Sequence, residues 1–199
     1  MEKKPDGRRV KMTKRLLKES LIELMKEKSI HAISIKDICD GADINRSTFY
    51  RHYNTQYELY DEIIDDIAAD IKEIFLSCNG ENFTVELLLT EVLQYIEKNR
   101  EQFLVILSDK GNISLGEAYN RITERFISRS NTGELGAYVA QFIAAGMTSV
   151  LWTWLNKENR RSAKEVAALI TSLMNHGLKR AIDFIAVDPS GKSDKTQEN

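Results

Sequence analysis

The chain has 199 residues, of which 42% are apolar and 29% charged, and it contains only two prolines. This composition excludes a disordered chain and predicts a folded, helical protein. The formal net charge of −2 is unevenly divided: residues 1–60 hold 13 Lys and Arg against 9 Asp and Glu, a net +4, whereas the rest hold 15 against 21, a net −6. A basic N-terminal region on an acidic body suggests a polyanionic partner for that region alone.

The sequence signals neither a metal site nor a disulfide. Cys39 and Cys78 are far apart and lack a Cys-x-x-Cys spacing, and the three histidines are scattered, so we expect no metal and no cofactor. Charged residues occupy the N-terminus, where an export signal would need an apolar stretch, which favours a cytoplasmic location. The near-apolar run 137–155 has the length of a membrane span, but its polar interruptions favour a buried core or interface helix.

Two helices are predicted in the first 41 residues. We expect residues 1–9 to form a mobile arm. Apolar residues at helical spacing then predict an amphipathic helix over 10–28. After a short break, Ser34 can cap a second helix over 35–41, whose third residue is acidic.

Two more helix starts follow closely. A tight connection contains Asp43, and Asn45 is a good N-cap for a third helix over 46–53. A Thr-x-x-Glu capping box that begins at Thr55 starts a long fourth helix over 55–78. This fourth helix is long enough to connect two bodies.

The rest of the chain continues the helical pattern. Further helices are expected at 84–99, 101–109, 113–130, 134–156 and 163–186, separated by Gly, Asn and Ser clusters. No alternating pattern of useful length predicts a strand. The sequence therefore predicts an all-α fold of about nine helices, in three parts: an N-terminal domain over 1–54, a helical regulatory and dimerisation domain over 55–187, and a disordered tail over 188–199.

Residues 34–53 have the pattern of a helix-turn-helix, in which the second helix enters a DNA major groove while the first braces it. Six apolar residues can pack this unit: Ile35, Ile38, Ala42, Ile44, Phe49 and Tyr53. The side chains left exposed suit base edges and phosphates, and they are Arg46, Ser47, Thr48, Tyr50, Arg51 and His52. Lys36 and Thr55 are placed to hold phosphates.

The segment from Ser34 to Leu59, SIKDICDGADINRSTFYRHYNTQYEL, resembles the N-terminal signature of the TetR (TetR/AcrR) transcriptional regulators. The resemblance covers about the first 60 residues. It implies a homodimer of all-helical subunits, each with a three-helix DNA-binding head and a larger body that binds an effector and dimerises. By position, the DNA contacts carry over to Lys36, Arg46, Ser47, Thr48, Tyr50 and His52.

The segment departs from the usual pattern of that family at two positions. Asp43 stands in the turn where glycine is typical, and it adopts a left-handed conformation less freely than glycine. Gln56 stands where the fourth helix often offers a lysine to a phosphate. We therefore do not expect that charge contact, and the N-terminal arm is a candidate to replace it.

The helices at 134–156 and 163–186 have the longest apolar faces. The resemblance implies that they form a four-helix interface between two subunits, with Tyr138, Phe142, Val150, Ile170, Leu173, Gly177 and Leu178 in contact. A two-fold dimer would place its recognition helices about 34–36 Å apart, one turn of DNA. The expected DNA partner is therefore a palindromic operator.

The effector is not readable from the sequence. Aromatic candidates for its pocket are Phe75, Phe83, Tyr95, Phe103, Tyr119, Phe126, Trp152 and Trp154. The segment MTSVLWTWLNKENRRSAKEVAALI also resembles a TetR subgroup that includes regulators of dihydroxyacetone kinase, in part of which the effector is a partner protein. A repressor released by a small molecule and a regulator or activator that docks a protein both stay open. No catalytic motif supports an enzyme.

Overall fold

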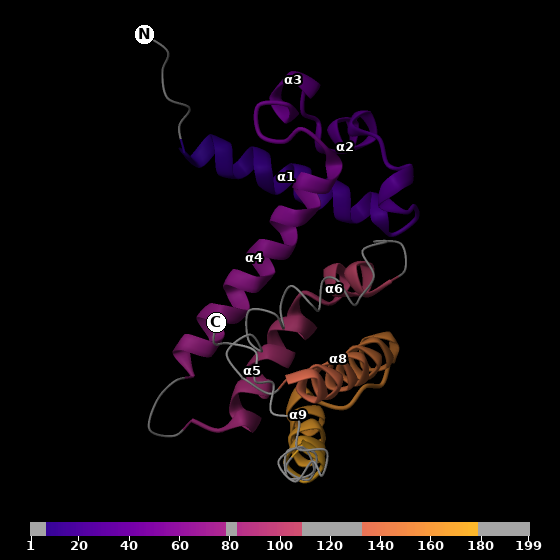
Figure 1. Cartoon of the computed structure of the whole chain (residues 1–199). Coiled ribbons are helices and arrows are strands. Elements are labelled where there is room, and N and C mark those ends of the chain that lie inside the picture. Colours follow the sequence, from indigo (N-terminus) through magenta and orange to yellow (C-terminus); the bar gives the residue numbers. More distant parts are fainter. Residues whose placement is uncertain (1–6, 79–82, 109–132, 179–199) are drawn as a thin grey trace, which may run out of the picture.

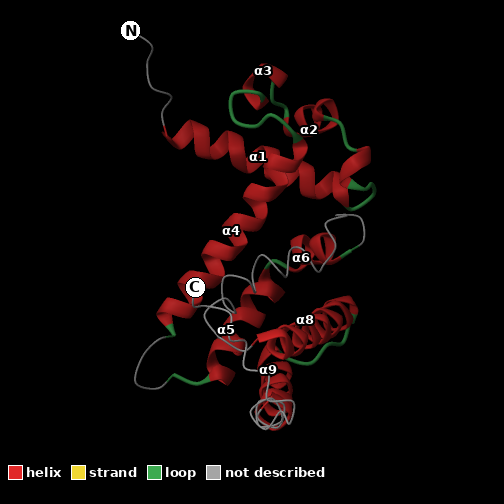
Figure 2. Ribbon diagram, viewed as in Figure 1, coloured by secondary structure: helices red, strands yellow, loops and turns green. Residues whose placement is uncertain are grey.

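The computed structural model of the chain describes residues 7–78, 83–108 and 133–178. Within these ranges every regular element is a helix and no strand occurs (Figure 2). The prediction of an all-α fold is confirmed. The expected helix at 113–130 and the expected disordered tail lie outside the described residues.

The first four helices form the head of the molecule. They are α1 (Gly7–Met25), α2 (Ile35–Ala42), α3 (Arg46–Phe49) and the first turns of α4 (Gln56–Ser77), with the short 3-10 turn η1 (Ile30–Ala32) between α1 and α2. Their shared core is fully buried and contains Leu17, Leu21, Ile38, Phe49, Leu59 and Ile63. Each such side chain stabilises the fold by about 1.5–3 kcal/mol. Because Leu59 and Ile63 come from α4, the packed head extends past residue 54.

The remaining described helices form the body, at the opposite end of the molecule from α3 (Figure 1). They are α5 (Val85–Lys98), α6 (Arg100–Leu107), α8 (Gly133–Asn156) and α9 (Ala163–Leu173), which ends in a π-helical turn (Met174–Leu178). α9 packs along α5, and α6 contacts both α8 and α1. The buried Trp154 indole donates to the Arg161 carbonyl at 2.7 Å and so fixes the α8–α9 connection.

The predicted end of the third helix and the predicted capping box at Thr55 both differ from the structure. The helix expected over 46–53 ends at Phe49, because the Phe49 carbonyl accepts from both the His52 amide (2.8 Å) and the Tyr53 amide (3.0 Å), which tightens the chain into a turn. The capping box expected at Thr55 is incomplete. Thr55 does accept from the Glu58 amide, but the Glu58 carboxylate binds the amide of Asn54 instead of that of Thr55.

The apolar run 137–155 lies in α8. No helix in the described part of the chain is long and apolar enough to cross a membrane. Leu155, at the end of the run, is fully buried in the body, whereas Phe142, near its start, is 80% exposed. The run therefore contributes both to the core of the subunit and to its surface.

Candidate nucleic-acid interface

The bracing helix of the helix-turn-helix, α2, begins at a complete capping box. The Ser34 hydroxyl oxygen accepts from the Asp37 amide at 3.1 Å, and the Asp37 carboxylate accepts from the Ser34 amide and hydroxyl at 3.1 and 2.8 Å. These bonds satisfy backbone amides that the helix start leaves unpaired. They also lower the pKa of Asp37. The predicted cap at Ser34 is confirmed.

α2 approaches α1 most closely at Gly41. The buried Ser20 hydroxyl of α1 donates to the Ile38 carbonyl of α2 at 2.9 Å. A Cβ atom added at Gly41 would lie 2.5 Å from Ser20 Oγ. Because only glycine fits there without displacing Ser20, Gly41 sets the distance at which α2 packs on α1.

The turn between α2 and α3 depends on Asp43, which adopts a left-handed conformation with φ 53° and ψ 44°. The Asp43 amide binds the Asp40 carbonyl at 3.3 Å, and the Ile44 amide binds the Cys39 carbonyl at 2.9 Å. This is the Schellman pattern that glycine usually supports. Asp43 keeps the expected turn, at the conformational cost that a side chain brings in this region.

Asn45 and Phe49 hold α3 in place. The Asn45 side-chain oxygen accepts from the amide and the hydroxyl of Ser47, both at 2.9 Å. Phe49 is fully buried, and the Tyr50 ring meets it edge-on at 5.8 Å between centroids. Of the predicted DNA-contacting set, Arg46, Ser47, Tyr50 and Arg51 are exposed, and Thr48 and His52 are half-buried. α3 and the turn that follows it therefore present two guanidinium groups and a phenol on their outer surface.

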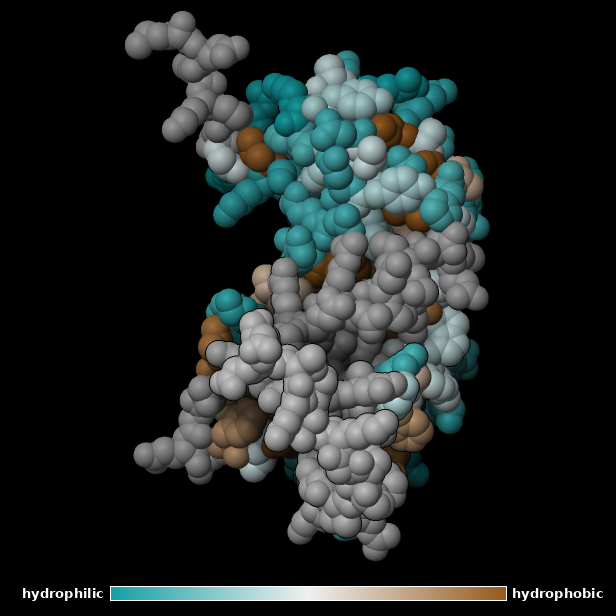
Figure 3. Space-filling view, viewed as in Figure 1, coloured by the Kyte–Doolittle hydropathy of each residue, from teal (hydrophilic) through white to brown (hydrophobic). Residues whose placement is uncertain are grey.

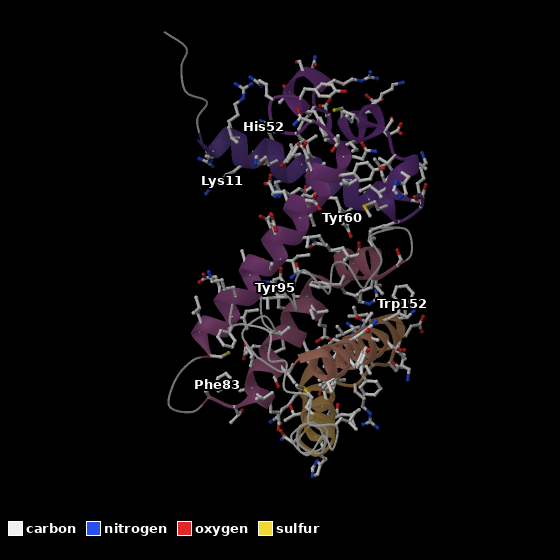
Figure 4. The ribbon with its side chains drawn as sticks, viewed as in Figure 1. Lys11, His52, Tyr60, Phe83, Tyr95 and Trp152 are labelled. Carbon is white, nitrogen blue, oxygen red and sulfur yellow. The ribbon has the colours of Figure 1, made fainter. Side chains whose placement is uncertain are left out.

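The two other predicted contact residues, Lys36 and Thr55, lie around α3, as does His52. Lys36 is exposed on the first turn of α2, and Thr55 is half-buried at the N-cap of α4. His52 lies on the same side of the head as Lys11 of α1 (Figure 4). Burial, together with the charges of Lys14 and Arg51, lowers the pKa of His52, so this imidazole is mainly neutral at pH 7. It can exchange hydrogen bonds with a phosphate but adds no full charge.

A cluster of charged side chains joins the head to α4. We call it the Glu62 cluster; it contains Lys14, Lys18, Tyr53, Glu62 and Asp66. Lys14 Nζ and Lys18 Nζ each lie 2.8 Å from one oxygen of Glu62, and Lys18 Nζ also lies 2.5 Å from Asp66. Lys14 Nζ sits 5.3 Å from the centroid of the Tyr53 ring, within cation–π range.

The interactions within this cluster favour the charged forms of Glu62 and Lys18. Burial opposes ionisation of Glu62, but the hydrogen bonds from Lys14 and Lys18 outweigh it and lower the pKa of Glu62 to about 2. Burial likewise opposes the charge of Lys18, but bonds to Asp66 and Glu62 raise its pKa overall. The Tyr53 hydroxyl is buried beside Glu62, and burial together with the Glu62 carboxylate raises its pKa. The ion pairs therefore persist at neutral pH.

Sequence reasoning did not find this cluster, although a signal was present. Lys14 and Lys18 are four residues apart on α1, and Glu62 and Asp66 are four residues apart on α4. Residues at that spacing share a helix face. It also missed the contact of His31 Nδ1 with the Tyr57 hydroxyl, 2.6 Å apart, which links η1 to the first turn of α4.

The head has a hydrophilic surface over an apolar core. In the space-filling view, hydrophilic residues cover the top of the molecule, where α2 and α3 lie (Figure 3). The described residues contain no group of His, Cys, Asp and Glu that could hold a metal ion. The arrangement of α2 and α3 can therefore bind a polyanion through arginine, hydroxyl and amide groups.

The predicted effector-pocket residues occupy separate places, and Tyr119 and Phe126 lie outside the described residues. The rings of Phe75 and Phe83 meet at 6.4 Å between centroids, at the far end of α4. Tyr95 meets Phe103 at 6.0 Å, and its hydroxyl donates to Asp70 at 2.8 Å. Trp152 is exposed and lines a cavity of about 440 Å³ between α1, α6 and α8.

The predicted interface residues divide between surface and core. Tyr138, Phe142 and Leu173 are exposed, at 56%, 80% and 63%. Gly177 is also exposed, and Val150 is half-buried; the side chain of Leu178 lies outside the described residues. Ile170 is 4% exposed and packs within the subunit, whereas its neighbour Leu169 is 56% exposed. The apolar surface therefore includes Leu169 in place of Ile170.

Two family models match separate parts of the chain. The one described as bacterial regulatory proteins of the tetR family matches residues 19–63, which contain α2 and α3. The one described as the transcriptional regulator C-terminal region matches residues 84–176, which contain the described helices of the body. The two matches therefore cover both the head and the body.

Curated relatives are similar over part of the chain. The HTH-type dhaKLM operon transcriptional activator DhaS of Lactococcus lactis is 27% identical over 89 residues, 45% of this chain and 46% of its own. The HTH-type transcriptional repressor KstR2 of Rhodococcus jostii is 24% identical over 105 residues, 51% of this chain and 52% of its own. The chain thus spans about half the length of the curated relatives it matches.

A solved structure shares the fold over most of the chain. The crystal structure of a TetR transcriptional regulator from Streptococcus agalactiae superposes with a TM-score of 0.60 at 21% identity, covering 84% of this chain and 96% of the other. The dihydroxyacetone kinase operon activator DhaS superposes with a TM-score of 0.50 at 20% identity, covering 84% of this chain and 97% of the other. At these identities the likeness concerns the fold.

Proposed function

This chain belongs to the TetR family of DNA-binding transcriptional regulators, and we propose that it acts as a homodimer that binds a palindromic operator through α3. The observation that carries the proposal is the outer surface of α3 and the turn after it, where Arg46, Tyr50 and Arg51 are exposed while Phe49 is buried beneath them. Arginine reads guanine edges with two hydrogen bonds, and tyrosine reaches phosphates. We expect the protein to act in the cytoplasm, where such an operator is accessible.

The proposed dimer rests on the exposed apolar surface of α8 and α9. Tyr138, Phe142, Leu169 and Leu173 are each more than half exposed in one subunit. A patch of this kind on a folded chain marks an interaction site. A two-fold axis through the patch would bury the same residues in both subunits. The two α3 helices would then reach successive turns of the same face of the DNA.

The proposed control is release of the operator by an effector that binds the body. α4 runs from the head, where Leu59 and Ile63 are buried, to the body, where Tyr95 of α5 donates to Asp70. An effector that binds two orientations of α4 with different affinity shifts the balance between them. Relief of repression is the mode of regulation that we propose first.

A second candidate is a regulator whose body docks a protein. The observation that favours it is an exposed apolar patch where α4 ends and α5 begins, formed by Leu76, Phe83, Val85 and Leu87. One relative of this chain, DhaS, is named a transcriptional activator, and another, KstR2, is named a repressor. Recovery of a soluble protein that binds the wild type but not a Leu87→Glu variant, with no small molecule releasing the DNA, would favour this candidate.

The test is footprinting of the purified protein on the DNA upstream of its gene and neighbouring genes. We expect protection of a palindrome, lost when a small-molecule fraction of cell extract is added. Tyr50→Ala and Arg46→Ala should each weaken binding by about 1–3 kcal/mol while the dimer stays folded. Arg161→Ala, which removes an exposed arginine of the body, is the matched control. Unchanged affinity in both head variants would contradict the assignment of α3.

A further inference from the structure

We propose that Glu62 of α4 is a positioning residue for DNA binding: its carboxylate binds two lysines of α1, one of which contacts the end of the helix-turn-helix, and thereby fixes the angle of α1–α3 on α4. This inference rests on the proposed function, because it concerns how accurately the two heads of a dimer are presented to DNA. Glu62 itself does not contact DNA in this proposal. It acts through Lys14 and Lys18.

The geometry supports this role because the Glu62 carboxylate of α4 binds two lysines of α1, and one of these lysines also contacts the segment that follows α3. Each Glu62 oxygen accepts from a different lysine of α1, at 2.8 Å in both cases. Lys14 also lies over the ring of Tyr53, the last residue of the turn that follows α3. A shift of the head relative to α4 would have to break or lengthen these contacts together.

The cluster is placed where it can respond to such a shift. Glu62 and Asp66 line a cleft of about 940 Å³ between α1, α4 and the corner between α5 and α6. The Glu62 side chain is 30% exposed and that of Lys18 is 17% exposed, so water can reach the ion pairs without unpacking the core. The Tyr53 hydroxyl is buried beside the Glu62 carboxylate. The head is thus held on this side by ion pairs that water can reach.

Simple electrostatics and the positioning role predict opposite effects of Glu62→Gln on the affinity for DNA. The substitution removes a negative charge from a DNA-binding head, so charge alone should strengthen binding to a polyanion. If Glu62 positions the head, the variant loses an ordered arrangement that binding must then restore, and affinity should fall. The sign of the change therefore separates the two explanations.

The experiment compares wild type with Glu62→Gln on the footprinted palindrome and on versions with one base pair inserted or removed at its centre. We expect the variant to bind the palindrome about tenfold more weakly, which is about 1.4 kcal/mol. We expect it to discriminate less between the three spacings, because its heads adopt a wider range of separations. The slope of affinity against salt should stay unchanged, since no phosphate contact is lost.

Two further variants keep the comparison interpretable. Lys18→Met removes the other side of the cluster and should also relax the preference for spacing. Glu73→Gln neutralises an exposed carboxylate further along α4 and should behave as wild type. Equal or tighter binding by Glu62→Gln with an unchanged preference for spacing would overturn the inference. Failure of the wild type to bind any palindrome would instead overturn the proposed function.

A measurement on the protein without DNA tests the positioning role of Glu62 whether or not the protein binds a palindrome. Spin labels are attached at Asp40→Cys in α2 and Lys72→Cys in α4, in a Cys78→Ser background. Their separation reports the distance between α2 and the C-terminal half of α4. The labelled chain is diluted with unlabelled chain, so that only distances within one subunit are measured. Both labelled positions are exposed, and the remaining Cys39 is buried. We expect a broader distance distribution in Glu62→Gln than in wild type. Identical distributions would contradict the positioning role.

Discussion

At the scale of single residues, the head depends on a few side chains whose partners lie far along the sequence. Glu62 binds Lys14 and Lys18, more than 40 residues earlier, and Ser20 of α1 binds the Ile38 carbonyl. A half-buried carboxylate with two lysine partners stabilises the fold only while it is ionised. The stability of the head should therefore depend on pH through Glu62.

The sign of that dependence follows from the pKa of Glu62, which falls from an ordinary 4.5 to about 2 in the folded chain. Its contribution is fully present above about pH 4.5 and is lost as the pH falls toward 2. Lys14, Lys18, Tyr53 and Asp66 surround the carboxylate, and Lys18, whose pKa is raised, stays charged throughout this range. Urea unfolding should show wild type more stable than Glu62→Gln by about 1–2 kcal/mol at pH 6, allowing for partial exposure.

At pH 3.5 we expect this difference in unfolding free energy to shrink, because the carboxylate begins to be protonated in the unfolded chain before the folded one. Glu73→Gln, which removes an exposed carboxylate from the same helix, is the matched control at both pH values. A difference between wild type and Glu62→Gln that is the same at both values would exclude Glu62 as the titrating group.

At the scale of helices, the sequence predicts starts better than ends and contacts. Ser34, Asn45 and Thr55 cap helices as expected, because an N-cap is a local interaction between neighbouring residues. The early end of α3 depends on the bonds to the Phe49 carbonyl, which local pattern does not specify. The α1–α4 ion pairs and the close approach at Gly41 join residues distant in sequence, so spacing alone could not assign them.

In the candidate site, too, the sequence predicts local features better than features that depend on contacts between distant segments. The outer residues Arg46, Tyr50 and Arg51 follow from the pattern of the helix-turn-helix, because burial of Phe49 turns them outward. Thr48 and His52 are half-buried because the chain turns after Phe49, which the expectation of a longer helix did not include. On the apolar face of α9, which packs along α5, Ile170 is buried within the subunit and Leu169 is exposed, a difference that the spacing of apolar residues does not specify.

At the contact between α1 and α2, we predict that the effect of Gly41→Ala on stability changes sign when Ser20 is replaced. Gly41→Ala should destabilise the head by about 1–3 kcal/mol, because the new Cβ would lie 2.5 Å from Ser20 Oγ. In a Ser20→Ala background that oxygen is absent, and the better helix propensity of alanine should make the same substitution neutral or stabilising by up to about 1 kcal/mol. Thermal unfolding of the four chains measures the coupling. Equal effects of Gly41→Ala in both backgrounds would show that the close approach is unimportant.

At the scale of the whole molecule, the proposed DNA-binding and dimer-forming surfaces lie at opposite ends, with α4 between them (Figure 1). A single head would reach only one half-site of the proposed palindrome. Joining two heads makes the second contact intramolecular, which raises the overall affinity by about 10²–10⁴. The apolar surface of α8 and α9 should therefore control DNA binding from a distance.

Phe142→Glu tests this connection, because Phe142 is 80% exposed in one subunit and a charge there would be buried in the proposed interface. We expect sedimentation to show monomers with unchanged helix content, and binding to the full palindrome to fall by at least about 100-fold. Leu76→Glu, a charge at an exposed leucine near the end of α4, should leave both properties unchanged. A Phe142→Glu protein that remains a dimer would place the interface elsewhere. A monomer that still binds the palindrome tightly would show that the two heads do not need to be joined.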